Sequence, residues 1–159
     1  MKRLVLFVCV LAMAATPASA AGSYGGSGSF QASPSSSDNY RVGLRHLKRE
    51  RYAEAIPYLQ AALAEKPRSA DRLNYLGFAY RKIGENNLSL AYYQRALEIE
   101  PDHKGANEYL GELYLQTNDL EKARGQLAVL ERLCPRGCDE REELETAIAA
   151  YQVPAPVTN

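Results

Sequence analysis

The sequence predicts an all-α protein in which helix pairs stack in one direction to form a solenoid. Two observations carry this prediction. Small, apolar and proline residues recur at an interval of 34 residues between about residues 36 and 137, a period typical of helix–turn–helix repeats. Within each interval, large apolar residues recur every three or four positions, which is the spacing of one helix face. We therefore expect three helix pairs, followed by a closing helix at residues 139–151.

The repeat is visible at several positions of each unit. In the second unit, Leu76, Tyr80 and Ile83 fall on one helical stripe. Proline ends a helix because it has no backbone N–H to donate and disfavours helix in the residue before it. The expected helices span residues 38–49, 53–65, 70–83, 86–99, 104–117 and 120–133. The positions that recur are Pro67, Pro101 and Pro135; Ala55, Ser89 and Ala123; Leu59, Tyr93 and Leu127; and Gly43, Gly77 and Gly111.

This pattern resembles the tetratricopeptide repeat over residues 36–135. In that family the first helix carries Leu-Gly and then Tyr, and the second carries Ala, an aromatic residue and Ala before Pro. The resemblance implies a right-handed α-solenoid with repeats at about 36–69, 70–103 and 104–137. Among the departures from the pattern, Glu50 replaces the usual turn glycine, and His46 stands where Tyr is usual. We interpret His46 as a partly buried core residue rather than a functional histidine.

The last helix pair needs a cover for its open apolar face, and residues 139–151 are expected to provide it. Leu144, Ala147, Ile148 and Tyr151 follow the spacing of a single apolar stripe. Asp139 is expected to cap this helix, with residue 142 as its capping partner. The closing helix and the three repeats together form the predicted folded domain, residues 38–151.

Both ends of the chain differ from the repeats. Residues 1–20 combine a basic start, an apolar run at 4–15 and the small residues Ala18-Ser19-Ala20, the pattern of a secretory signal peptide. We expect cleavage after Ala20 and export, to the periplasm if the source is bacterial; a eukaryotic secretory origin stays open. The Gly- and Ser-rich residues 21–37 and the residues 152–159 are expected to form a flexible leader and a flexible tail.

Two cysteines, Cys134 and Cys138, remain after the predicted cleavage and lie between the last repeat helix and the closing helix. Thiols this close in an exported protein are expected to form a disulfide. A redox-active pair is an alternative, although three residues separate the cysteines rather than the two of thioredoxin-like sites. Metal binding is a weaker alternative, because His46 and His103 are the only other soft ligands in the mature chain.

The family resemblance also implies where a ligand would bind. In tetratricopeptide repeats, ligand contacts come from fixed positions of the first helices, which line the concave side. The carboxylate clamp of some family members is not expected here, because Tyr40 and Leu44 occupy the positions that the clamp gives to Lys and Asn. We expect a groove that holds an extended or helical peptide, although each position is also compatible with an ordinary solvated surface. The predicted groove residues are Tyr40, Leu44, Lys48, Asp71, Asn74, Phe78, Arg81, Lys82, Glu108, Glu112 and Gln116.

Composition narrows the classes of function. Basic and acidic residues balance at 19 each, so no strong field favours nucleic acid or an anionic membrane. No nucleophile stands at a recognisable elbow, and no Gly-rich phosphate loop lies between a strand and a helix. The sequence thus predicts a non-catalytic scaffold without a cofactor, whose partner is a protein or peptide. The competing hypotheses are thiol–disulfide chemistry at the two cysteines and a structural subunit of an envelope assembly.

Overall fold

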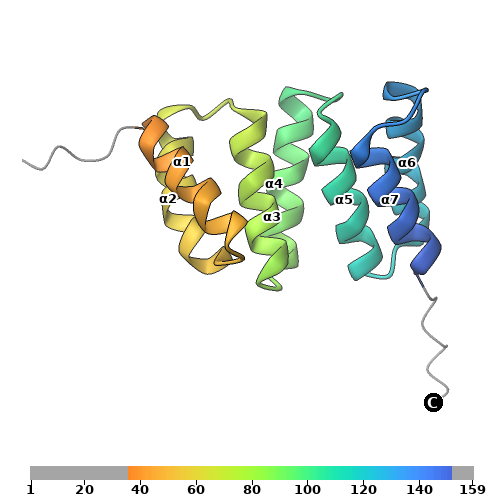
Figure 1. Ribbon diagram of the computed structural model, residues 1–159, viewed down its shortest axis with the longest axis horizontal. Coiled ribbons are helices and arrows are strands. Elements are labelled where there is room, and N and C mark those ends of the chain that lie inside the picture. The colour runs from red at the N-terminus through yellow and green to blue at the C-terminus, as the bar shows by residue number, and fades with distance from the viewer. Residues whose placement is uncertain (1–35, 152–159) are drawn as a thin grey trace, which may run out of the picture. The chain divides into compact units, whose positions relative to one another are not determined.

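The computed structural model describes residues 36–151, and these form helices joined by short turns (Figure 1). The expected all-α solenoid is confirmed, and no strand occurs in this range. The predicted signal peptide and C-terminal tail lie outside the described residues, as does the predicted leader up to residue 35. The helices are α1 (Ser36–Lys48), α2 (Tyr52–Glu65), α3 (Ala70–Lys82), α4 (Asn86–Ile99), α5 (Lys104–Gln116), α6 (Leu120–Leu133) and α7 (Asp139–Ala150).

The helices pack as consecutive antiparallel pairs, α1 with α2, α3 with α4 and α5 with α6. The first helices also contact one another along the series α1, α3, α5 and α7, whereas α2, α4 and α6 do not contact one another. Neighbouring first helices are therefore closer together than neighbouring second helices. The face formed by α1, α3, α5 and α7, called the first-helix face below, is accordingly the inner side of the stack.

The turns inside the three pairs share one backbone feature. Glu50, Gly84 and Asn118 follow one another at the repeat interval, and all three have positive φ, at 57°, 84° and 62°. A left-handed residue after the last helical turn is the usual way to reverse the chain, and glycine adopts it at the least steric cost. The turn geometry is thus kept in the first unit although Glu50 stands in place of glycine.

Small residues allow close helix contact, as the repeat pattern predicts. A Cβ atom on Gly77 would lie 2.6 Å from the ring of Tyr93, which is fully buried in the facing helix α4. The equivalent Gly43 faces Leu59 of α2 in the same way. Gly111 differs, because the side chain that fills its space is Leu144 of the closing helix. The third unit is therefore packed as tightly against α7 as the first two are against their own second helices.

Helix α7 covers the end of the stack through Leu144, which is fully buried and contacts the α5 layer. The expected cap is wrong: Cys138 is the N-cap residue, its side chain makes no capping hydrogen bond, and Asp139 is already the first helical residue. The cysteine pair holds the start of this helix close to the end of α6, with the two Cα atoms 5.8 Å apart. That separation lies within the range that a disulfide requires.

Candidate functional site: the first-helix face

Aromatic side chains from three helices meet on the first-helix face. We call Tyr40 of α1, Tyr75 and Phe78 of α3 and Tyr109 of α5 the aromatic row. The ring centroids of Tyr40 and Tyr75 are 6.1 Å apart, and those of Phe78 and Tyr109 are 4.9 Å apart. All four rings are half-buried. Burial, and next the charge of Asp71, raise the pKa of Tyr40 to about 12, so its hydroxyl stays protonated at neutral pH.

Arg81 lies beneath this row and is almost fully buried, with 5% of its surface exposed. Its guanidinium carbon is 5.5 Å from the ring centre of Phe78 and 5.7 Å from that of Tyr109. It forms an ion pair with Glu112 of α5. A guanidinium between two rings gains cation–π attraction in addition to its ion pair. Arg81 therefore ties α3 to α5 and orients the two rings above it.

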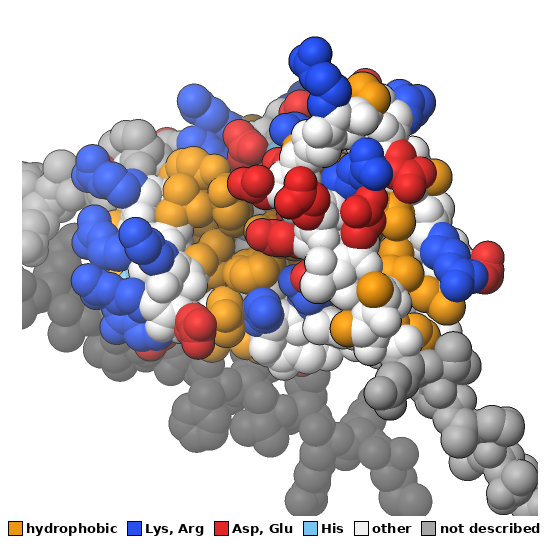
Figure 2. Space-filling view, turned by 45° about the vertical axis from the view of Figure 1, so that its right-hand side comes forward, with side chains coloured by type: hydrophobic (Ala, Val, Ile, Leu, Met, Phe, Trp, Pro, Cys, Tyr) orange, Lys and Arg blue, Asp and Glu red, His pale blue; other side chains and the backbone are white. Residues whose placement is uncertain are grey.

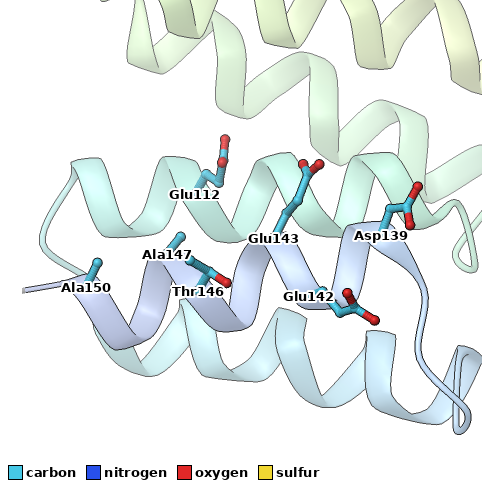
Figure 3. A pocket seen from close by; sticks show the side chains of 7 residues that line it. All are labelled: Glu112, Asp139, Glu142, Glu143, Thr146, Ala147 and Ala150. Atoms are coloured by element: carbon cyan, nitrogen blue, oxygen red, sulfur yellow. The ribbon is translucent and has the colours of Figure 1, made fainter.

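An acidic group occupies the α5–α7 end of the face. Glu112 and Glu143 line a cleft of about 500 Å³ between these helices, together with Asp139, Glu142, Thr146, Ala147 and Ala150. Figure 3 shows Glu112, Glu143 and Asp139 pointing to the same side of the helix layer, whereas Glu142 points away from them. The cleft thus presents carboxylates next to the small side chains of α7.

Glu108 extends this acidic group into the interior. It is only 3% exposed, and its Oε1 atom has no hydrogen-bond partner within the described residues. Burial is the main cause that raises its pKa to about 9, followed by the hydrogen bond and the charge of the facing Glu143 carboxyl. Glu108 is therefore protonated at neutral pH unless a cation approaches it.

The opposite end of the face carries basic side chains. Lys48 is exposed in the last turn of α1, and Lys82 is exposed at the end of α3 with its Nζ 5.4 Å from the Phe78 ring centre. Leu44 is half-buried against the core beside them. Figure 2 shows apolar side chains lying between Lys and Arg on one side and a group of Asp and Glu on the other. The face is thus graded in charge.

The predicted groove residues fall into two groups by burial. Asn74, Arg81 and Glu108 are 4%, 5% and 3% exposed, so they shape the face from beneath and present little surface. The others in the described range are half-buried or exposed. Tyr75 and Tyr109 pack against the core as well as lying on this face, and the sequence pattern did not point to Glu143. The 34-residue phase, extended into the closing helix, relates Glu143 to both tyrosines and was the signal that could have found it.

The two histidines have structural contacts: His46 packs against a ring, and His103 caps a helix. The His46 ring stacks on Tyr58 at 5.3 Å between centroids, and its Nδ1 lies 3.3 Å from Glu54. His103 caps α5: its Nδ1 accepts a hydrogen bond from the Ala106 N–H, and its Nε2 lies 3.1 Å from Asp71. Within residues 36–151, no group of three or more potential ligands is arranged to hold a metal ion. Among the described helices, none is long and apolar enough to cross a membrane.

Two segments match family models of the tetratricopeptide repeat, residues 70–103 and residues 92–125. Over residues 70–125, the chain matches the tetratricopeptide repeat. Among related sequences, the protein ycf37 of Guillardia theta is 34% identical over 92 residues, which is 55% of this chain and 52% of ycf37. The chain thus spans about half of the length of this relative.

Solved tetratricopeptide structures share the fold. The Sgt2 TPR domain from Aspergillus fumigatus superposes with a TM-score of 0.65 at 21% identity, covering 80% of this chain and 89% of that domain. The Yersinia enterocolitica type III secretion chaperone SycD, in complex with a peptide of the translocator YopD, superposes with a TM-score of 0.63 at 18% identity. This match covers 72% of this chain and 87% of SycD.

Proposed function

We propose that this chain is a non-catalytic protein-interaction module that holds a peptide segment of another protein on the first-helix face. The observation that carries the proposal is the aromatic row. Its four rings are half-buried, so part of each stays accessible, whereas the leucines of α3 and α5 at positions 73, 76, 110 and 113 are buried. Accessible rings with fixed geometry supply contact area at low entropic cost, as in other peptide-binding grooves.

Two further features support the same proposal. The rings are held in place by Arg81 and by contacts between α3 and α5, so the surface is ordered before a ligand arrives. SycD, which shares the fold, was solved with a peptide of its translocator partner. The graded charge of the face would set the direction of a bound segment.

The proposal also includes the compartment and the cysteines. We propose that the chain is exported after cleavage behind Ala20, and that Cys134 and Cys138 form a structural disulfide that fixes α7. The 5.8 Å separation of their Cα atoms supports this bond. An intact mass of the chain recovered from the cell envelope tests both points. A mass that retains residues 1–20, or two free thiols, would contradict them.

Photo-crosslinking tests the binding face directly. The full chain is produced in its source cells with a photoreactive phenylalanine at position 78 or, as a control, at position 88. Leu88 is an exposed apolar residue of α4, outside the first-helix face. We expect a discrete protein adduct from position 78 and none from position 88. Equal labelling from both positions, or adducts from position 88 alone, would remove the support for this face.

A further inference from the structure

Two carboxylates on the first-helix face lack a cationic partner. Glu143 of α7 lines the cleft and its carboxyl adjoins that of Glu108 of α5, and neither carboxylate forms an ion pair with a Lys or Arg side chain of residues 36–151. The nearby cations are already engaged, because Arg81 pairs with Glu112 and Lys104 lies 3.6 Å from Glu140. No Lys or Arg side chain of the described residues therefore compensates the Glu108–Glu143 pair.

The position of Glu108 makes this arrangement unusual for a solvated surface. Glu108 is only 3% exposed to solvent, and its Oε1 atom has no hydrogen-bond partner in the described range. A buried acceptor without a partner is costly and is rarely tolerated without a reason. Repulsion from Glu143, added to burial, keeps a proton on Glu108 in the absence of a ligand.

The pair also lies beside the aromatic row. Tyr109 directly follows Glu108 in α5, and its ring contacts Phe78 of α3 at 4.9 Å between centroids. Burial raises the pKa of Tyr109, and the neighbouring Glu108 carboxyl raises it further. A ligand whose apolar side chain rests on these rings therefore brings its neighbouring residue to the carboxylates.

We propose that Glu108 and Glu143 together bind a Lys or Arg side chain of a peptide segment whose apolar side chains lie on the aromatic row. A cation in the cleft makes a charge-assisted hydrogen bond to the exposed Glu143 carboxylate, and its charge favours the ionised form of Glu108 beneath it. It also removes the repulsion between the two groups, and the proton on Glu108 is released to water. This inference rests on the proposed function, and it adds the chemistry of the ligand.

The test begins with panning of a random dodecapeptide library against the folded chain. Recovered peptides are synthesised with a fluorescent label, and their affinities are measured by anisotropy. The variants are Glu143→Gln for the pair, Phe78→Ala for the aromatic row, and Glu98→Gln as a control. Glu98 is exposed on α4, so its substitution changes the net charge equally at a distant surface.

We expect the recovered peptides to share a Lys or Arg next to an apolar residue. Glu143→Gln is expected to weaken their binding about tenfold, the effect of losing one charge-assisted hydrogen bond, whereas Glu98→Gln leaves it within twofold. Replacing the shared Lys or Arg of the peptide by Gln is expected to weaken binding to the parent chain by a similar factor. The same replacement should change binding to the Glu143→Gln variant little.

Two results overturn the inference in distinguishable ways. Peptides that lose affinity with Phe78→Ala but show no preference for Lys or Arg, or no response to Glu143→Gln, would mean that the carboxylate pair only shares a proton. The groove would then stand and the ligand chemistry would be wrong. Failure to recover any peptide that depends on Phe78 would remove the proposed function together with the inference.

Discussion

Two buried ionisable residues of one face, Arg81 and Glu108, differ in the charge of the side chain that each meets. Arg81 forms an ion pair with Glu112 and lies against the rings of Phe78 and Tyr109. Glu108, at the same depth, meets another carboxyl in Glu143. Burial and like charge both favour the neutral form of an acid. Arg81 therefore joins α3 to α5 through its ion pair, whereas Glu108 adjoins the Glu143 carboxyl of α7 as a neutral acid.

This difference predicts a pH dependence of stability that originates at Glu108. Its pKa rises from the ordinary 4.5 to about 9 on folding, so between these values the folded chain binds more protons than the unfolded chain. Stability therefore falls as pH rises through that window, and the contribution is complete below 4.5. Glu108→Gln is expected to raise the free energy of unfolding at pH 9 by about 1–3 kcal/mol and to leave it unchanged near pH 4.

Urea unfolding of the parent, of Glu108→Gln and of the exposed-site control Glu98→Gln at both pH values measures this effect. The difference between parent and Glu108→Gln should grow with pH, while Glu98→Gln follows the parent throughout. A Glu108→Gln curve parallel to the parent at all pH values would show that the Glu108 carboxyl titrates normally.

At the scale of the helices, most boundaries followed from the sequence. Prolines, turn residues and the 34-residue phase placed every helix end within two residues of its position in the structure. The cap of α7 was missed because Asp139 suits both the N-cap and the first turn, where a carboxylate also complements the helix dipole. The partner of Gly111 was missed because the pattern describes contacts inside a pair, whereas Leu144 reaches it from the next unit.

Helix α7 is predicted to open as a separate unit when Leu144 is truncated. Leu144 is fully buried against Gly111, and α7 contacts only α5 and α6. Leu144→Ala is expected to cost about 2–5 kcal/mol, concentrated in α7 because contacts in a repeat array involve only nearest neighbours. Hydrogen exchange is expected to accelerate in α7 and α5 and to change little in α1 and α2.

The half-buried Ile148 on the same helix provides the matched control, and Ile148→Ala is expected to have a smaller effect. Uniform acceleration of exchange across all seven helices described here would show that α7 is part of one cooperative unit. Because Glu143 lies on α7, local opening would also remove half of the carboxylate pair, so peptide binding should weaken with it.

At the scale of the whole molecule, the sequence indicated which residues lie on the first-helix face but not which of them are buried. The repeat phase, with the family resemblance, placed Tyr40, Phe78 and Lys82 on the first-helix face, where the structure has them. It could not show that Arg81 and Glu108 lie beneath the surface, since their burial depends on how closely α3, α5 and α7 approach. Charge pairing across repeats is therefore knowable only from the assembled stack.

Binding of a peptide segment to the first-helix face can be followed residue by residue. A peptide recovered from the library is titrated into the chain while backbone amide chemical shifts are recorded by NMR. We expect the largest changes to cluster around Tyr40, Phe78, Tyr109 and Glu143, on four different helices of one face. Changes centred instead on α2, α4 and α6, or on the turn between Cys134 and Cys138, would contradict it.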